Sequence, residues 1–314
     1  MSFISLLHQH DDTDWLQVLF TLEPHTHPVD QRATRIWFSF FPLKLKRAYD
    51  LAEDKAKFET SLTLKGKYLL SDQVDESAHF LYGHRYWPNV KAAVAEHAAA
   101  ESTAPLPDQI LELANKIAAT VKVERSLLIG ITAVAFMTLE QVGVEKMKAT
   151  AEANVKYSSK SPDQIVNARN AEASQGVFGF LRTVDKRFNV TFNENEPEAK
   201  FGVINMQDIT MAAAEVTLPK HLSDSRCREG EGPIPVECRT CACGTCWVGV
   251  LSDTNKISPP NERELDKIRN VFCYDGFTGE KDSPIRMACQ VKCHGNVSIV
   301  IPPWHGLLKK LNKS

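Results

Sequence analysis

Residues 238–246 read CRTCACGTC, and this stretch sets Cys238, Cys243 and Cys246 in a C-x4-C-x2-C spacing. Cys289 follows later in the chain and completes a pattern of four cysteines. A [2Fe–2S] cluster is held by four cysteine thiolates, and three in one short loop with a distant fourth is a known arrangement of them. The spacing therefore predicts one such cluster, with these four residues as its ligands.

The other residues of the loop fit the same chemistry. A tight loop can supply three thiolates to two iron ions only when its remaining residues are small, as Ala242, Gly244 and Thr245 are. Such a loop also turns backbone N–H groups toward the sulfurs and stabilises their negative charge. Because none of the eight cysteines precedes Cys227, their clustering favours metal ligation over disulfides.

Around this loop the chain resembles the 2Fe–2S ferredoxin family, both plant-type and adrenodoxin-like. The resemblance covers roughly residues 185–303 and is strongest from residue 233 onward. Five stretches that flank or include the ligands carry it: PVEC at 235–238, WVGVL at 247–251, SPPNEREL at 258–265, RMACQ at 286–290 and GNVSIVIP at 295–302.

The resemblance implies a fold, a cofactor and a role. The fold is a β-grasp, a mixed sheet crossed by a helix that residues 209–216 would form, with the cluster under one loop near the surface. The role is electron transfer through one [2Fe–2S] cluster. The chain would act as a subunit of a larger oxidoreductase complex, or as its dedicated donor or acceptor, without catalytic activity alone. An enzyme with an unrecognised catalytic site in the helical region is a further alternative.

Two departures from the family pattern affect the cysteines. Cys241 stands where the family usually has glycine, which makes it a possible substitute ligand beside Cys238 and Cys243. Residues 218–232 form a longer stretch than usual, which indicates a surface insertion. The four cysteines outside the pattern are predicted to be free thiols: Cys227, Cys241, Cys273 and Cys293.

A zinc site is the alternative reading of the same residues. Cys243 and Cys246 could join Cys289 and Cys293 around one zinc ion, because four thiolates make a closed structural site. The chain would then be a structural or interaction protein with a metal-stapled C-terminal domain. The separation between the two pairs is longer than in most zinc ribbons, and zinc leaves the ferredoxin-like flanks unexplained.

The pattern along the whole chain predicts an α+β protein in four parts. These are a helical N-terminal region (1–104), a second helical segment with a candidate docking role (105–184), the ferredoxin-like domain (185–303) and a basic C-terminal tail (304–314). The predicted helices cover 14–20, 29–41, 43–61, 72–81, 89–100, 124–141 and 163–173, with another beginning near 108. The predicted strands cover 188–192 and 200–206.

Composition limits the choice of partners. The chain of 314 residues is 43% hydrophobic and has a net charge of −2, so a nucleic acid is not expected as a partner. The longest apolar run, at 127–139, is shorter than the ~20 residues of a transmembrane helix and predicts a buried core helix. The first twenty residues lack the pattern of a signal peptide, which favours the cytoplasm.

Residues 1–184 contain no recognised cofactor motif. They have no G-x-G-x-x-G, which argues against a fused flavin- or NAD-binding reductase domain. Three histidine pairs are candidates for metal or haem, although solvated or core histidines are favoured: His8 with His10, His25 with His27, and His79 with His84. Aromatic residues of this region are predicted to contact a redox partner or a second copy of the chain, with burial inside a monomeric helical domain as the alternative: Trp15, Trp37, Phe38, Phe40, Tyr86 and Trp87.

Overall fold

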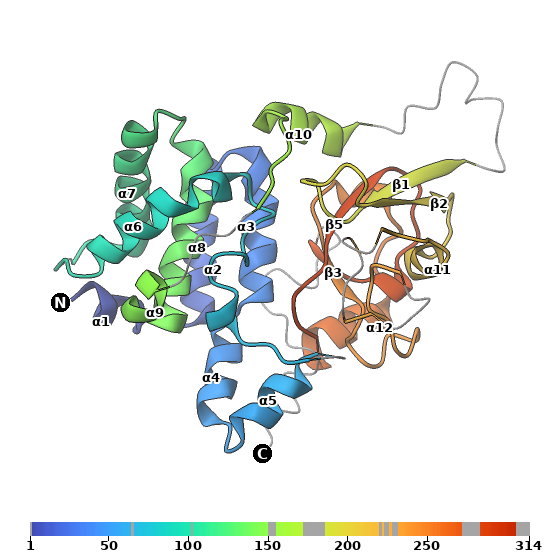
Figure 1. Cartoon of the computed structure of the whole chain (residues 1–314), viewed down its shortest axis with the longest axis horizontal. Coiled ribbons are helices and arrows are strands. Elements are labelled where there is room, and N and C mark those ends of the chain that lie inside the picture. The colour runs from blue at the N-terminus through green and yellow to red at the C-terminus, as the bar shows by residue number, and fades with distance from the viewer. Residues whose placement is uncertain are drawn as a thin grey trace. The chain divides into compact units, whose positions relative to one another are not determined.

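The computed structural model describes residues 2–63, 66–101, 103–149, 155–171, 186–219, 222, 226–227, 232–271 and 283–305. The chain divides into two compact units. Unit 1 comprises Met1–Arg47 and Leu69–Tyr157, and unit 2 comprises Ala48–Tyr68 and Ser158–Ser314. Unit 1 is helical and unit 2 contains the sheet (Figure 1), so the chain is α+β, as its sequence predicts.

Eight helices begin in unit 1, and α4 continues across its boundary into unit 2. Their bounds are α1 (Phe3–Leu7), α2 (Asp12–Leu22), α3 (Pro28–Phe40), α4 (Leu43–Leu51), α6 (Trp87–His97), α7 (Leu106–Val121), α8 (Ser126–Val142) and α9 (Val144–Ala149). Local signals set several of the ends. Asp11 and Asp14 form a capping box at the start of α2, and Pro28 begins α3.

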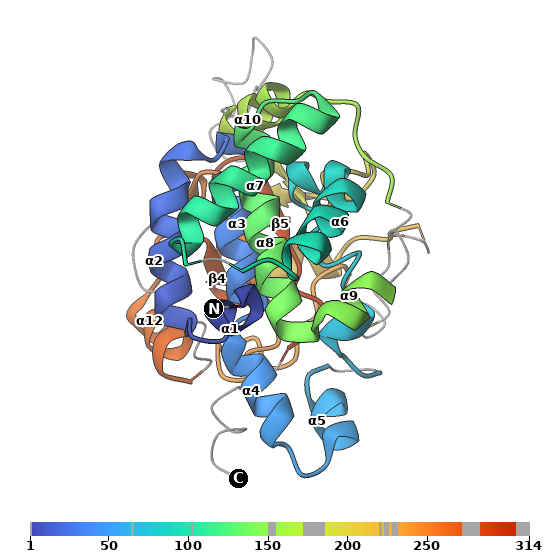
Figure 2. The ribbon, with the colours of Figure 1, turned by 90° about the vertical axis from the view of Figure 1, so that its left-hand side faces the viewer.

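Helix α8 is the centre of unit 1. Every residue from Leu127 to Glu140 is buried, because α3, α6 and α7 all pack against it (Figure 2). A helix that is apolar on all sides must be enclosed in this way, so the predicted buried helix is confirmed. No helix in the described part of the chain has the length and apolar content needed to cross a membrane.

The aromatic residues of unit 1 belong to its core. Five of the six side chains predicted to contact a partner are at most 8% exposed: Trp15, Trp37, Phe38, Phe40 and Trp87. The rings of Trp37 and Phe41 lie 4.7 Å apart. Helix α3 is buried around most of its circumference, so aromatic residues on its different faces all pack inside. The prediction that these five form an interface is therefore wrong.

Two predicted helices differ in the structure. Residues 73–81 form successive turns, because the Asp75 carboxylate accepts hydrogen bonds from the Trp87 indole and the Lys91 ammonium at 2.7 and 2.8 Å. The predicted helix at 43–61 is interrupted. Asp54 accepts a hydrogen bond from the Lys57 amide at 2.9 Å and caps a new helix, α5 (Lys55–Ser61).

Unit 2 contains short helices and all the strands described. Its other elements are α10 (Pro162–Asn170), β1 (Arg187–Thr191), β2 (Lys200–Ile204), α11 (Ile209–Ala214), β3 (Trp247–Val250), α12 (Glu262–Asp266), β4 (Ile285–Met287) and β5 (Val297–Val300). The predicted strands at 188–192 and 200–206 correspond to β1 and β2. The predicted boundary near 185 lies outside the described residues.

The five strands form one mixed sheet in the order β2-β1-β5-β3-β4 (Figure 1). Strand β1 runs antiparallel to β2 and parallel to β5. Strand β3 runs antiparallel to both β5 and β4, with Trp247 opposite Met287. Helix α11 follows β2 and packs against it. The parallel pair at the centre therefore joins strands from opposite ends of unit 2.

The start of the predicted C-terminal tail is packed within unit 2. Trp304 is fully buried, and its ring lies 5.0 Å from that of Trp247. The Trp247 indole also donates a hydrogen bond to the Trp304 carbonyl at 3.2 Å. Trp304 therefore belongs to the folded unit, and the tail beyond His305 lies outside the described residues.

A buried carboxyl group makes the stability of unit 1 depend on pH. Burial raises the pKa of Glu140 to about 7, against the opposing effect of its 3.0 Å hydrogen bond from the Trp15 indole. The folded state therefore holds this proton at a pH where the unfolded state releases it. The stability that Glu140 contributes is complete below its unfolded pKa and is lost as pH rises through about 7.

We expect Glu140→Gln to flatten this pH dependence, because glutamine keeps an acceptor for Trp15 and cannot ionise. Thermal unfolding of the wild type should lose stability, relative to this variant, between about pH 5 and pH 8. The exposed residue Glu96 on α6 provides the control, since Glu96→Gln should follow the wild-type profile. A wild type and a Glu140→Gln variant with parallel pH profiles would contradict the assignment.

Candidate metal centre

The sheet register places Cys246 beside Cys289. Cys246 directly precedes β3, and Cys289 follows β4 after one residue. The Ala288 amide donates to the Cys246 carbonyl at 2.9 Å, which extends the antiparallel β3–β4 pairing toward the loop. The Cys246 and Cys289 side chains are close enough for each to shift the pKa of the other. These two predicted ligands, distant in sequence, are therefore adjacent.

The other two predicted ligands form a second pair. The Cys243 and Cys238 side chains are close enough for each to shift the pKa of the other. The two pairs also lie within electrostatic reach of each other, since Cys238 affects the pKa of Cys289 and Cys243 affects that of Cys246. The four cysteines of the predicted set thus occur as two neighbouring pairs, and within the described ranges no three of them are close enough together to hold a single metal ion.

Hydrogen bonds favour the thiolate form of one cysteine in each pair. Burial opposes ionisation of Cys238, but the Thr240 and Ala242 amides lie 3.4 and 3.2 Å from its sulfur and help to lower its pKa to about 6. The hydrogen bond from Cys246 is the largest cause that lowers the pKa of Cys289 to about 7. The predicted N–H groups aimed at sulfur are therefore present at Cys238.

The other cysteine of each pair has a raised pKa. The hydrogen bond to Cys289, together with burial, raises the pKa of Cys246 well above its ordinary value. Burial likewise raises the pKa of Cys243. Cys246 and Cys289 are buried, whereas Cys238 and Cys243 are partly exposed. The site thus has an inner pair against the sheet and an outer pair toward solvent.

Cys241 occupies a strained position inside the loop. Its φ angle is +61°, in the left-handed region that glycine adopts without a steric cost. Its thiol is buried, and burial with the nearby Cys289 and Glu264 raises the pKa of Cys241 to about 12. Its backbone N–H is directed at the Cys289 sulfur. A glycine at this position would adopt the same backbone conformation without that cost.

The remaining cysteines have different surroundings. Cys293 is fully buried, and burial with the nearby Asp208 carboxylate raises its pKa to about 12. Cys227 is half-buried, and Cys273 lies outside the described residues. Every cysteine that the structure describes carries a free thiol, as predicted for the described ones outside the ligand pattern.

No three or more His, Cys, Asp or Glu side chains within the described ranges are grouped so that they could hold one metal ion. None of the three histidine pairs of unit 1 is therefore part of such a group in the described residues. His84 stacks on Trp87 with ring centroids 5.6 Å apart, and burial lowers its pKa to about 3. His79 is close enough to contribute to this shift. His84 is therefore a neutral core residue, the reading that its sequence favoured.

A buried ion pair, which sequence reasoning missed, holds the strand that leads to Cys289. The Arg286 guanidinium donates to both carboxylate oxygens of Glu264 at 2.8 and 2.9 Å, and the two side chains are 1% and 0% exposed. Arg286 also donates to the Ser258 carbonyl, and the Met287 amide donates to Glu264. These bonds fix α12 against β4, immediately before the ligand.

We expect Glu264→Gln to destabilise unit 2 by about 3–5 kcal/mol, because it leaves the Arg286 charge buried without its counter-charge. The double variant Glu264→Met with Arg286→Met removes both charges and should recover much of that loss. Chemical denaturation of the apo protein measures both. A double variant that is no more stable than the single one would show that the pair is not the source of the cost.

The strain at Cys241 gives a second expectation. Cys241→Gly should fold with stability within about 1 kcal/mol of the wild type, because relief of the left-handed conformation offsets the flexibility of glycine. Cys241→Val should be clearly less stable, since a β-branched residue tolerates this conformation worst. Thermal unfolding compares the two. Equal stability of both variants would mean that the positive φ angle carries no strain.

Comparison of the chain with protein-family models, curated protein sequences and solved structures returns no match in any of the three.

Proposed function

We propose that this chain transfers electrons through one [2Fe–2S] cluster held by Cys238, Cys243, Cys246 and Cys289. The observation that carries the proposal is the arrangement of these four thiols in two adjacent pairs. When bound, the cluster supplies a centre that takes up and releases one electron at a time. The chain itself supplies the thiolates, the hydrogen bonds to them and the partial exclusion of water.

The donor set fits two iron ions better than one zinc ion. A [2Fe–2S] cluster would need four thiolates around two iron ions, and the chain offers two neighbouring pairs, Cys238 with Cys243 and Cys246 with Cys289. A structural zinc site needs four ligands around a single point. Cys293, the fourth member of the zinc set, lies near Asp208 and Arg286.

The sheet supports the β-grasp interpretation. Strands β1 and β5 are the first and last strands along the chain, and they are parallel neighbours in the sheet order β2-β1-β5-β3-β4. Helix α11 lies between β2 and β3 in the chain and so connects the β1–β2 hairpin to the other strands. This agrees with the mixed sheet crossed by a helix that the ferredoxin resemblance implies. The predicted crossing helix at 209–216 corresponds to α11.

The surroundings of the cysteines suit a centre that exchanges electrons with another protein. The inner pair is shielded by the sheet, and the outer pair is partly exposed, so a partner can approach from the side of Cys238. The amides of Thr240 and Ala242 would stabilise negative charge on Cys238 sulfur. We assign the chain the role of a subunit, or a dedicated donor or acceptor, of a larger oxidoreductase.

Metal analysis tests the proposal directly. Protein purified without oxygen should contain about two irons and two acid-labile sulfides per chain and show visible absorption. Cys289→Ala should lose the iron and the colour, because no loop cysteine can replace a ligand held by β4. Cys227→Ala, at a half-buried cysteine outside the set, is the matched control and should keep both.

The variant Cys293→Ala distinguishes the iron–sulfur proposal from the zinc alternative. The iron–sulfur set excludes this residue, so the variant should retain its iron and sulfide. Colourless protein with one zinc ion per chain, lost in Cys293→Ala, would establish the zinc site and contradict electron transfer through a cluster.

A further inference from the structure

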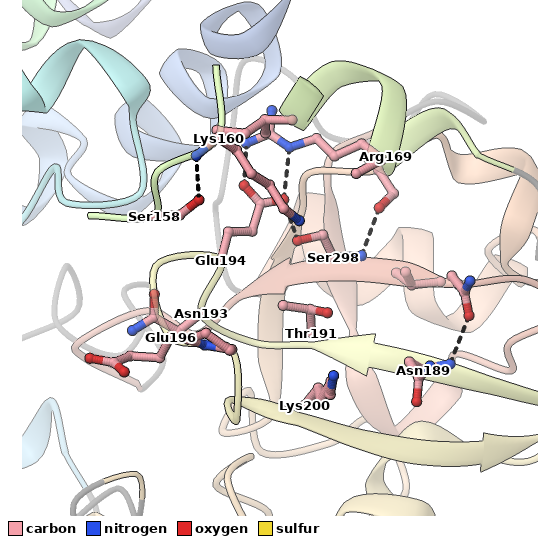
Figure 3. Close-up of a pocket in the computed structure, with 16 residues that line it drawn as sticks. Ser158, Lys160, Arg169, Asn189, Thr191, Asn193, Glu194, Glu196, Lys200 and Ser298 are labelled. Atoms are coloured by element: carbon pink, nitrogen blue, oxygen red, sulfur yellow. Dashed lines mark hydrogen bonds and ion pairs between the residues drawn. The ribbon is translucent and has the colours of Figure 1, made fainter. Parts of the chain in front are cut away.

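A pocket of about 370 Å³, lined mainly by residues with polar side chains, lies in unit 2 (Figure 3). Its walls come from the segment leading into α10, from α10 itself, from β1 and the loop after it, and from the start of β5. Cysteine is absent from this lining. The pocket is therefore distinct from the candidate metal centre, and its own chemistry decides what it could bind.

One carboxylate of the lining already has a full set of donors. Glu194 accepts hydrogen bonds from Arg169 at 2.9 and 2.7 Å and from the Ser298 hydroxyl at 2.6 Å. Burial would raise the pKa of Glu194, but Arg169 and Ser298 hold it below its ordinary value. Glu194 is thus an ionised, neutralised part of the wall, with little capacity left to accept from a ligand.

A buried lysine adds positive charge behind this wall. The Lys256 ammonium donates to the Arg169 and Ala171 carbonyls at 2.6 and 2.7 Å, and the residue is 7% exposed. These carbonyls belong to the C-terminal end of α10, which a cation stabilises. Arg169 and Lys256 are two positively charged residues of this region, and Arg169 is paired with Glu194.

Two asparagine side chains are oriented as donors. The Asn296 side-chain oxygen accepts from the Asn189 amide at 2.9 Å, and the Asn193 side-chain oxygen accepts from the Asn195 amide at 3.0 Å. Each oxygen is therefore engaged with the backbone, which leaves the NH₂ groups of Asn193 and Asn296 to donate to a ligand.

Two exposed lysines contribute further donors from different elements. Lys160 precedes α10, Lys200 begins β2, and Thr191 lies between them in Figure 3. Neither ammonium forms an ion pair with a described residue, although Lys160 is near enough to Glu194 to affect its pKa. Glu196 is the opposing charge of the lining. Donors and positive charge thus outnumber acceptors.

We propose that this pocket binds a small anion whose phosphate or carboxylate oxygens accept hydrogen bonds from Lys160, Lys200 and the two asparagine amides. Charge-assisted hydrogen bonds of this kind are the strongest that a polar pocket offers. A volume of about 370 Å³ accommodates a metabolite-sized ligand. This site does not depend on the cluster, so it can be tested separately.

Isothermal titration calorimetry of the full-length protein with inorganic phosphate and with succinate tests the site. We expect saturable binding that weakens as salt is added, and a loss of about tenfold in affinity in Lys160→Gln and in Lys200→Gln. Glu196→Gln should bind more tightly, because it removes the opposing charge. Stronger binding of phosphate or of succinate identifies which group the natural ligand carries.

The controls use residues outside the pocket and a neutral ligand. Lys57→Gln changes an exposed lysine of α5 and should leave the affinity unaltered. Glucose, which is uncharged, should bind far more weakly than either anion. Absence of saturable binding for both anions at millimolar concentrations would overturn the proposal. Equal affinity in the wild type, Lys160→Gln and Lys200→Gln, all with wild-type thermal unfolding, would also overturn it.

Discussion

The position of Cys289 depends on one buried ion pair. Burying two charges carries a large desolvation cost, which only a dense set of hydrogen bonds can offset. Glu264 and Arg286 meet that condition with two mutual bonds and two more to the backbone of Met287 and Ser258. The pair joins α12 to β4, and β4 pairs with β3 beside Cys246. The inner thiol pair is thus fixed by the sheet and the ion pair together.

The outer pair depends instead on local backbone conformation. Arg239, Cys241 and Gly244 all have positive φ angles, so the loop reverses direction repeatedly within a few residues. Only glycine adopts this region without cost, and here two of the three residues are not glycine. The same turns direct the Thr240 and Ala242 amides at the sulfur of Cys238. Strain in the loop and hydrogen bonds to the sulfur therefore have one structural origin.

The sequence predicted those features that have short-range signatures. Cysteine spacing picked out four residues that the structure arranges as two neighbouring pairs, while their role as ligands stays a prediction, and alternation identified β1 and β2. The amino-acid sequence alone could not predict the Glu264–Arg286 ion pair, because two residues that are 22 positions apart leave no periodic signal. The prediction that the aromatic residues of unit 1 form an interface failed for a related reason. Burial of Trp37 depends on packing around α3, which the spacing of residues along one helix does not reveal. Asp75 likewise replaced a predicted helix with turns through contacts to Trp87 and Lys91.

Unit 2 contains two bidentate arginine–carboxylate pairs with different consequences for their surroundings. Around Arg286 every polar neighbour is itself hydrogen-bonded in the interior, so the pair acts only on the position of the strand. Around Arg169 the carboxylate is satisfied, while the lysines and asparagine NH₂ groups beside it still face a pocket. Because the Glu194 carboxylate is already hydrogen-bonded to Arg169 and Ser298, it does little to neutralise the lysines that line the pocket, and the local potential there is more positive. The same pair of residue types thus makes a closed support at one site and an anion-favouring wall at the other.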